Sequence, residues 1–302
     1  MEKIIIEISK EKTSLSKERG FLNVTQSGKT TSVAIDNIFS VIITSTDALL
    51  SKNVINALTE KGIIIFLCGS SFLPESVILP TTIHCLSGSR MKTQINASRD
   101  LNEKLWQTII RQKIHNQATV LSYFDPFSKD FARLNFLEKS VLKNDSSNAE
   151  GQASKVYFKA LFGKEFIRNR SAEDCNIYLN YAYIVLRSCI IRAICASGLT
   201  AVLGIKHCNP TNAYPLADDL IEPFRPIADY FVKKISERHK NEKTELTPAI
   251  KREICGLLTF PCKGDHGKLL LPEAIAKTVY SLTESYKNSE DTLYFPKLNL
   301  SS

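Results

Sequence analysis

The N-terminal part of the chain alternates short apolar runs with polar turns, a pattern typical of β-strands. Gly20 and Gly28 mark tight turns between the runs. The stretch 49–61 differs, because its apolar positions recur with the helical period and Gly62 is placed to end a helix. We therefore predict a small β-rich domain over residues 1–80, with one helix. Its predicted strands cover residues 4–8, 13–17, 21–26, 32–35, 38–44 and 62–67.

Residues 81–90 are predicted to link this domain to a second one, because glycine, serine and proline punctuate the chain there. Beyond them the apolar positions recur every three to four residues, as in amphipathic helices. The run 176–197 is apolar on nearly all sides and predicts a buried helix. The predicted fold class is α+β: a small β-rich N-terminal domain followed by a larger all-α domain over residues 91–302. Further helices are predicted over 90–121 and 124–142, from 153, 215, 224 and 248 onward, and over 272–286, with a loop over 261–267.

Candidate chemistry lies in the segment that follows the predicted buried helix. His207 precedes a loop, and Pro215 is suited to begin a helix that carries Asp218, Asp219 and Glu222. Spacings of three and four residues would place Glu222 on one helix face with either aspartate. An imidazole with carboxylates is a shell for Mg²⁺ or Mn²⁺, and the histidine favours Mn²⁺. The alternative is that the acids only complement the helix dipole and that His207 is a core residue.

Glu150 is a further acidic candidate, near the start of the preceding helix. A cluster of Asp, Ser and Asn residues before it favours a helix N-cap. A carboxylate there also has a simpler explanation, which is favourable pairing with the helix dipole. Gly151 is unusual in a helix, where glycine costs about 1 kcal/mol relative to alanine. Such a glycine would leave room for a ligand or another backbone to approach.

The charge balance of the chain indicates a polyanionic binding partner. Lys and Arg number 39 against 31 Asp and Glu, a net charge of +8 that favours nucleic acid over membrane. The excess lies in the C-terminal two thirds, although a solubilising surface would give the same balance. The 8 cysteines form no CxxC pair, no signal peptide is recognisable, and no apolar run reaches about 18 residues without a charge. We therefore expect a reduced, cytoplasmic protein that does not enter a membrane.

Four blocks of the sequence together resemble one known family, the CRISPR-associated integrases called Cas-one (Cas1). The blocks occur in the family's order, and the resemblance covers essentially the whole chain. Residues 113–118 also look like the family, and the short length and N-terminal strands look most like its type II members. The four blocks are 148–153 with 157–158, 179–187, 204–207 and 219–226.

The resemblance implies a metal-dependent DNA endonuclease and integrase whose helical domain is catalytic. Such proteins insert a prespacer duplex into a CRISPR array by transesterification from a DNA 3′-hydroxyl. The family's metal ligands, a glutamate, a histidine and an acid, fall on Glu150, His207 and Glu222. Asp219 is the family's neighbouring acid, and Asp218 is kept in reserve as a ligand. Many members have aspartate where this chain has Glu222, so the longer side chain requires its helix to stand slightly further off.

The resemblance also implies partners. The family forms homodimers through the N-terminal sheets, and two dimers flank a dimer of the partner Cas-two (Cas2) in a heterohexamer that binds DNA. A Cas-nine effector module is a further candidate partner. Two other functions stay open: a structure-specific, metal-dependent DNA nuclease in repair, and a non-catalytic DNA-binding scaffold. The basic residues placed to meet DNA phosphates, or else to serve as surface charge, are Lys155, Arg168, Lys206 and Arg225.

Overall fold

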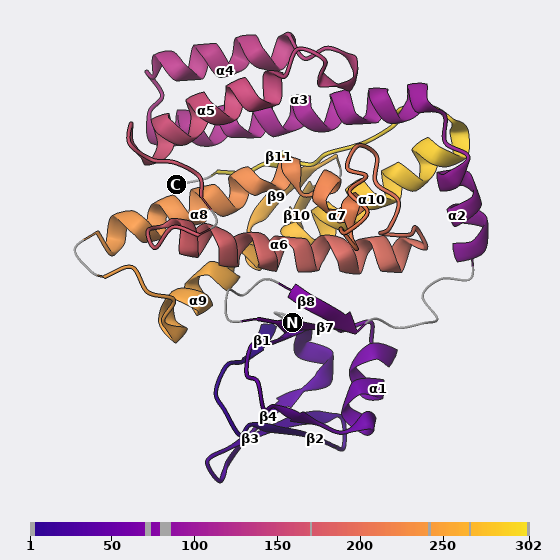
Figure 1. The fold of residues 1–302 in the computed structure, drawn as a ribbon, viewed down its shortest axis with the longest axis vertical. Coiled ribbons are helices and arrows are strands. Elements are labelled where there is room, and N and C mark those ends of the chain that lie inside the picture. The colour runs from indigo at the N-terminus through magenta and orange to yellow at the C-terminus, as the bar shows by residue number, and fades with distance from the viewer. Residues whose placement is uncertain are drawn as a thin grey trace. The chain divides into compact units, whose positions relative to one another are not determined.

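The computed structural model describes residues 4–69, 74–78, 86–169, 171–240, 243–265 and 267–300. The chain divides into two compact units, Met1–Ile83 and His84–Ser302. The predicted α+β class is confirmed, because strands dominate the first unit and helices the second (Figure 1). Within the predicted linker, residues 81–85 lie outside the described residues, and helix α2 (Ser87–Ile95) begins in its second half.

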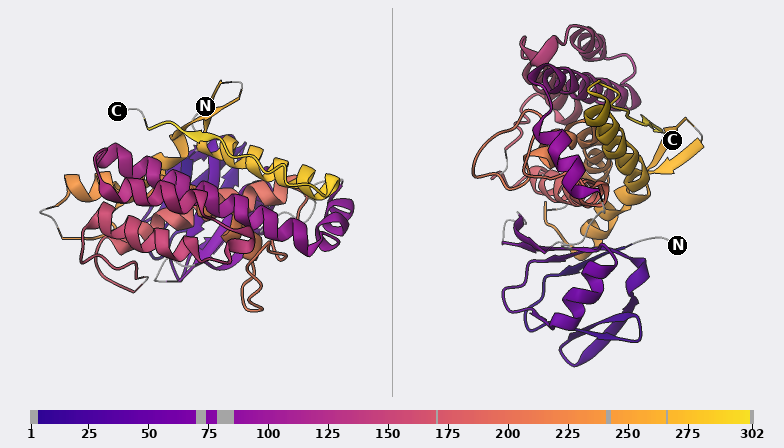
Figure 2. Two further views of the ribbon diagram at one scale, coloured as in Figure 1. Left: turned by 90° about the horizontal axis from the view of Figure 1, so that it is seen from above. Right: turned by 90° about the vertical axis from the view of Figure 1, so that its right-hand side faces the viewer.

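The N-terminal unit contains two four-stranded sheets and helix α1 (Lys52–Glu60). In one sheet β1, β5 and β7 are parallel and β8 is antiparallel at the edge, whereas the other has the order β4-β3-β2-β6. Apolar side chains such as Leu22, Val41 and Leu58 give both sheets and α1 a common core. Figure 2 shows α1 beside the strands of this unit. The strands are β1 (Ile4–Ile8), β2 (Ser14–Glu18), β3 (Phe21–Gln26), β4 (Lys29–Ala34), β5 (Ile38–Ile43), β6 (Leu49–Leu50), β7 (Ile64–Cys68) and β8 (Pro74–Ile78).

The second unit is organised around α6 (Asn176–Ser197), which is buried on most sides, as its apolar pattern predicts. Its length and hydropathy would suit a membrane span, yet 72% of its most apolar window is buried inside the protein. Helices α8 and α10 pack against α6, and α3 packs with α4 and α5 (Figure 1). The other helices are α3 (Arg99–Phe124), α4 (Lys129–Lys139), α5 (Ala149–Phe162), α7 (Pro215–Leu220), α8 (Arg225–Arg238), α9 (Pro248–Cys255) and α10 (Leu271–Asn288).

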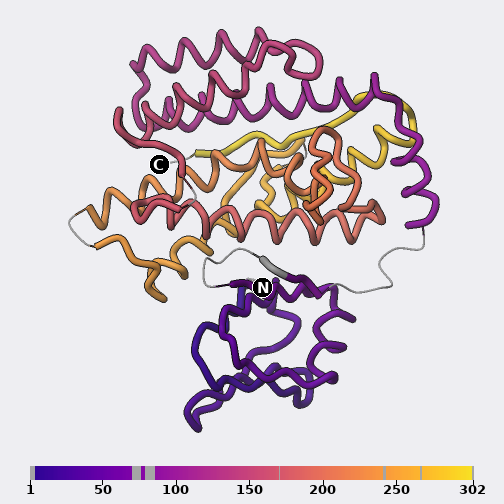
Figure 3. The backbone as a smooth tube through the Cα atoms, viewed as in Figure 1, coloured from indigo at the N-terminus to yellow at the C-terminus, as the bar shows by residue number. Residues whose placement is uncertain are grey.

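The sequence predicted an all-α second domain, but the second unit also contains strands. The predicted loop 261–267 is largely strand, because β9 (Pro261–Gly264) pairs with β10 (Gly267–Leu270) and with β11 (Lys297–Leu298). The C-terminal segment that contains β11, yellow in Figure 3, runs back along α3. Thr108 of α3 donates a hydrogen bond to Asp291 of that segment (2.6 Å).

The helix predicted over 90–121 is two helices. Asn96 is the C-cap of α2, and Ser98 begins α3 by accepting a hydrogen bond from the backbone N–H of Leu101 (3.1 Å). A serine N-cap satisfies an N–H group that has no partner inside the helix, so the chain can start a new helix there. The apolar stripe begins at Leu101, inside α3, and Ile95 of α2 is exposed, so the hydrophobic pattern carries no information about the break.

Gly198 ends α6 with a φ of 74°, in the left-handed region where other residues are strained. We predict that Gly198→Ala lowers the free energy of unfolding by about 1 kcal/mol. Urea denaturation followed by the fluorescence of Trp106 measures this loss. Gly88→Ala is the matched control, because Gly88 lies in α2 with open space around it and should tolerate alanine without loss. Equal destabilisation of both variants would contradict the requirement for a left-handed residue at position 198.

Candidate active site

A buried aspartate shapes the loop that carries His207. Asp219 of α7 is fully buried and accepts hydrogen bonds from the backbone N–H groups of Ile205 (2.6 Å), Lys206 (3.0 Å) and His207 (3.2 Å). Gly204 opens this loop because no side chain fits: a Cβ there would lie 2.3 Å from the backbone oxygen of His207. The loop therefore closes around a single carboxylate.

The same carboxylate orients the imidazole of His207. Its Nδ1 lies 2.6 Å from Asp219 Oδ1, and the rings of Trp106 and His207 lie edge to face with centroids 5.7 Å apart. The hydrogen bond to Asp219 raises the pKa of His207, although burial opposes this effect. Since Nδ1 faces Asp219, Nε2 is the ring nitrogen left for a ligand. A carboxylate on the far nitrogen is a common way to orient a metal-binding histidine.

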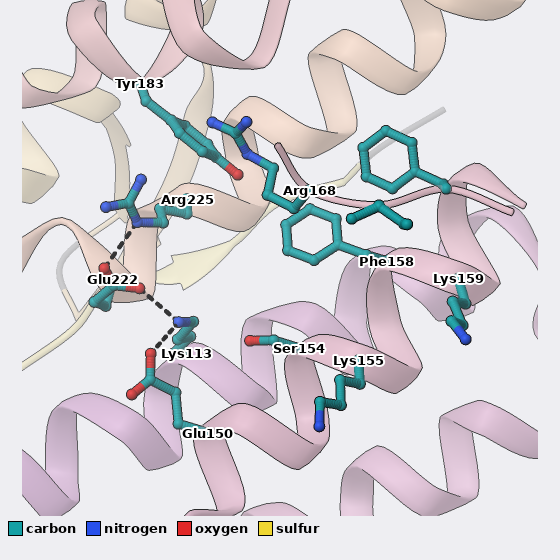
Figure 4. A pocket seen from close by; sticks show the side chains of 12 residues that line it. Lys113, Glu150, Ser154, Lys155, Phe158, Lys159, Arg168, Tyr183, Glu222 and Arg225 are labelled. Atoms are coloured by element: carbon teal, nitrogen blue, oxygen red, sulfur yellow. Dashed lines mark hydrogen bonds and ion pairs between the residues drawn. The ribbon is translucent and has the colours of Figure 1, made fainter. Parts of the chain in front are cut away.

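Two glutamates from distant parts of the sequence meet on one lysine. Lys113 Nζ lies 2.6 Å from Glu150 Oε1 and 2.6 Å from Glu222 Oε2 (Figure 4). Arg225 Nε lies 2.8 Å from the other oxygen of Glu222. Burial would raise the pKa of Glu222, but the charges of Arg225 and Lys113 lower it to about 2. Burial would lower the pKa of Lys113, but the two glutamates raise it, so Lys113 and Glu222 are both charged at neutral pH.

Two asparagines hold the backbone from which these glutamates extend. Asn116 of α3 donates a hydrogen bond to the backbone oxygen of Pro223 (2.7 Å), inside the 3₁₀ turn Glu222–Phe224. Asn148 is the N-cap of α5, with a φ of 52°, and accepts a hydrogen bond from the backbone N–H of Gly151 (3.2 Å). Each glutamate therefore begins from a short segment whose geometry is set by a neighbouring amide side chain.

Gly151 makes room for this cap. A Cβ on Gly151 would lie 2.6 Å from Asn148 Oδ1, closer than real Cβ contacts allow. The prediction that a ligand or another backbone approaches Gly151 is therefore wrong, because the side chain that fills the space comes from three residues earlier in the same chain.

A cavity of about 460 Å³ lies beside the glutamates (Figure 4). Three of the four residues predicted to meet DNA phosphates, Lys155, Arg168 and Arg225, line it together with Glu150 and Glu222. The cavity thus joins an acidic pair to a basic wall. The fourth predicted phosphate-binding residue, Lys206, donates a hydrogen bond to Asn144 Oδ1 (2.8 Å) instead. The lining also includes the aromatic side chains of Phe158, Phe166 and Tyr183.

Tyr183 supports the arginines of the cavity wall. The guanidinium groups of Arg225 and Arg168 lie 4.5 Å and 5.2 Å from the centre of its ring. Its hydroxyl donates a hydrogen bond to Asp229 (2.5 Å), a carboxyl group whose pKa burial raises to about 6. The hydrogen bond to Asp229 therefore fixes the orientation of the Tyr183 ring, against which both guanidinium groups pack.

The predicted acidic helix is interrupted before Glu222. Helix α7 ends at Leu220, and Glu222 opens the separate 3₁₀ turn. Pro223 has no N–H group to continue the helical hydrogen bonding. The prediction of one helix that carries Asp218, Asp219 and Glu222 is therefore wrong.

Each aspartate has a partner of its own. Asp218, the reserve ligand, accepts hydrogen bonds from Arg187 at 2.8 Å and 3.0 Å. Asp219 accepts hydrogen bonds from three backbone amides and contacts Nδ1 of His207, so it orients the histidine. Lys113 is a site residue that the sequence did not single out, and its side chain is only 8% exposed. Only the likeness of residues 113–118 to a known family drew attention to it.

The donor set fits a divalent cation. Two carboxylates and an imidazole nitrogen suit Mn²⁺ or Mg²⁺, and the two glutamates already converge on one positive charge. Within the part of the chain that the structure describes, no three His, Cys, Asp or Glu residues are grouped to hold a metal. Metal binding by Glu150, His207 and Glu222 therefore stays a prediction.

The sequence matches the family model for CRISPR associated protein Cas1 over residues 6–254. The chain belongs to the Cas1 family. It is 37% identical over 269 residues to the CRISPR-associated endonuclease Cas1 of Neisseria meningitidis serogroup C (strain 8013), covering 88% of this chain and 87% of that protein. The resemblance found in the sequence is thus confirmed.

Solved structures share this Cas1 fold. A casposase bound to an integration product has a TM-score of 0.80 at 18% identity, with 97% of this chain and 92% of that chain covered. A chain of a Cas6-RT-Cas1–Cas2 complex has a TM-score of 0.77 at 16% identity, with 99% of this chain and 36% of that chain covered. At these identities the comparisons establish the fold.

Asp219→Asn tests how His207 is held. We predict that the pKa of His207 falls towards its ordinary value of 6.5, because the hydrogen bond to Asp219 is the main cause of its elevation. An NMR titration of the imidazole measures the change. Asp218→Asn removes the same charge from the next residue, but Asp218 is paired with Arg187, so a much smaller fall is expected. Equal falls in both variants would mean that general electrostatics, not the hydrogen bond, sets the value.

Glu222→Gln tests the buried carboxylate. The pKa of Glu222 is about 2 in the folded chain, below its ordinary 4.5, so its stabilising effect is present above about pH 4.5 and is lost as the pH falls towards 2. We predict that the wild type is the more stable at about pH 6, and that its advantage shrinks by about 2 kcal/mol by pH 3. Urea unfolding followed by Trp106 fluorescence measures both values.

Glu245→Gln is the control for this experiment. Glu245 is 55% exposed and pairs with the exposed Lys243, so its removal should change stability little at any pH. A difference between wild type and Glu222→Gln that stayed constant over the whole range would contradict the lowered pKa.

Proposed function

We propose that the chain is a metal-dependent DNA integrase and endonuclease that inserts prespacer DNA into a CRISPR array. The observation that carries this proposal is the convergence of Glu150 and Glu222 on one cationic centre beside a cavity with a basic wall. Membership of the Cas1 family supplies the substrate class. The names of similar proteins, a CRISPR-associated endonuclease and a casposase bound to an integration product, support DNA cleavage and strand transfer.

The residues have separate tasks in this reaction. Glu150, Glu222 and Nε2 of His207 would hold Mg²⁺ or Mn²⁺, which supplies Lewis acidity at the phosphate and at the attacking hydroxyl. Asp219 keeps a proton on Nδ1 of His207, so that Nε2 carries the lone pair. Glu222 needs no deprotonation before it binds a cation, since its pKa is about 2. Arg225 is placed to offset negative charge on the reacting phosphate.

The chemistry exchanges one phosphodiester for another. The 3′-hydroxyl of the prespacer strand loses its proton, and its oxygen bonds to a phosphorus of the repeat. The 3′-oxygen of the cut strand leaves and takes up a proton, so the number of phosphodiesters is unchanged and no nucleotide cofactor is needed. Lys155 and Arg168 would neutralise phosphates of the entering strand, and DNA affinity should therefore fall as salt rises.

The proposal includes DNA and Cas2 as partners. A Cas6-RT-Cas1–Cas2 complex contains a chain with the same fold, which supports Cas2 as the protein partner. A homodimer formed through the N-terminal sheets, a heterohexamer around a Cas2 dimer, a Cas-nine module and a cytoplasmic location belong to the proposal on the strength of the family resemblance alone.

Hydrolysis is the second candidate function. Water in place of the 3′-hydroxyl would turn the same site into a DNA nuclease, and the name of the Neisseria meningitidis relative, an endonuclease, favours this activity. The two candidates share every residue of the site and differ only in the attacking group.

The experiment combines the protein and its Cas2 partner with a 3′-hydroxyl duplex and a supercoiled plasmid that carries a repeat. We predict joined products with the wild type, and a loss of at least about 100-fold in Glu150→Ala and in His207→Ala, because each removes a group that stabilises the transition state. Duplex binding at low salt should persist in both variants. Glu138→Ala, a carboxylate on α4 that pairs with His115, should retain full activity.

Each other result assigns a different function. Cleaved plasmid without joined products would favour the nuclease. Strand transfer that is undiminished in both Glu150→Ala and His207→Ala would mean that these groups are not catalytic and that the chain acts as a DNA-binding scaffold.

A further inference from the structure

Lys113 places a buried positive charge where the proposed function requires a metal ion. Its side chain is 8% exposed, and its ammonium group bridges one oxygen of Glu150 and one of Glu222, each at 2.6 Å (Figure 4). An ammonium between two carboxylates offsets their repulsion and satisfies their lone pairs, which are also the electrostatic effects of a bound divalent ion.

The acidic pair is already neutralised without a metal. Lys113 and Arg225 bring two positive charges to two negative ones, and both oxygens of Glu222 have cationic partners. A divalent ion that bound Glu222 would have to replace one of these partners, because two cations at one carboxylate oxygen repel each other. Metal binding at Glu222 would therefore exchange one of its cationic side-chain partners for the metal ion.

Lys113 is the partner that can be exchanged. Arg225 rests on the ring of Tyr183 and presents a planar group with a fixed direction, whereas a lysine is a point charge on a flexible stem. Lys113 also lines the cavity of about 460 Å³ itself, so its ammonium has open space to move into without rearrangement of the helices. That space is bounded by Ser154, Lys155 and Arg168, on the side where the proposed DNA phosphates would lie.

We propose that Lys113 is an exchangeable internal cation, which holds Glu150 and Glu222 together in the metal-free chain and leaves them when a divalent ion binds. The inference rests on the proposed function, since it needs a metal at the same two glutamates. It assigns Lys113 two effects: it keeps the empty site folded, and it lowers the affinity for the ion by competing with it.

Lys113→Met tests the competition, because methionine keeps most of the unbranched side chain and removes the charged ammonium group. Mn²⁺ binding is measured by electron paramagnetic resonance on the full chain, together with thermal unfolding. We expect the metal-free variant to unfold at a lower temperature than the wild type, Mn²⁺ to restore much of this loss, and the dissociation constant to fall at least tenfold. Lys104→Met, on the exposed side of α3 and paired with Asp100, should change neither quantity.

A measurement on the unchanged protein covers the case in which Lys113→Met does not fold. The ammonium group is protected in the metal-free chain, so reductive methylation should leave Lys113 largely unmodified. Saturating Mg²⁺ should increase its modification several-fold, as read by mass spectrometry of the peptide. Lys155, which lines the same cavity, is the internal reference and should react equally with and without Mg²⁺.

The outcomes separate this inference from the function on which it rests. An unchanged or weaker affinity in Lys113→Met, or modification of Lys113 that does not respond to Mg²⁺, overturns the exchange and leaves Lys113 as a positioning residue for the glutamates. Glu150→Gln should weaken Mn²⁺ binding in either case. If Glu150→Gln and the wild type bind Mn²⁺ alike, the metal site is elsewhere, and both proposals fail.

Discussion

A charge that is removed from water must meet an opposite charge, and the helical unit depends on this constraint at Lys113. The ammonium comes from the middle of α3, Glu150 from the first turn of α5, and Glu222 from the turn after α7. Removing Glu222 would leave the half-buried Arg225 without the carboxylate it binds and Lys113 with one partner in place of two, which destabilises the unit. The site therefore contributes to the assembly of the unit and is not an addition to a finished scaffold.

The acidic segment divides its work among three carboxylates. Asp218 binds Arg187, Asp219 closes the His207 loop, and Glu222 faces the cavity. Adjacent residues of a helix point in different directions, so Asp218 and Asp219 of α7 face different partners, and Glu222 lies in the separate 3₁₀ turn. The proline after Glu222 breaks the helix, and in doing so it allows neighbours in the sequence to serve different parts of the structure.

The sequence predicted the architecture well because hydrophobic periodicity reports what is buried. It located β1 to β5, β7 and the buried α6 but not β6 or β8, and it placed Glu150, His207 and Glu222 among the site candidates. It missed Lys113, because a lysine in an amphipathic helix gives no sign of the carboxylates that pair with it from 37 and 109 residues away. It also missed β9 to β11, whose pairing brings Lys297–Leu298 back to residues 262–263, a long-range contact that no local pattern encodes. Local sequence patterns do not reveal which residues distant in the chain will contact each other.

Helix α6 also constrains the order in which the chain can fold. It is apolar enough to resemble a membrane segment, and the helices that cover it, α8 and α10, follow it in the sequence. During synthesis α6 leaves the ribosome with these covers still unmade. Until α10 emerges, the nascent chain exposes apolar surface of α6 of the kind that chaperones and membrane-targeting factors recognise. A chain truncated before α10 would lack one of the two covering helices and would leave part of the apolar surface of α6 exposed to water.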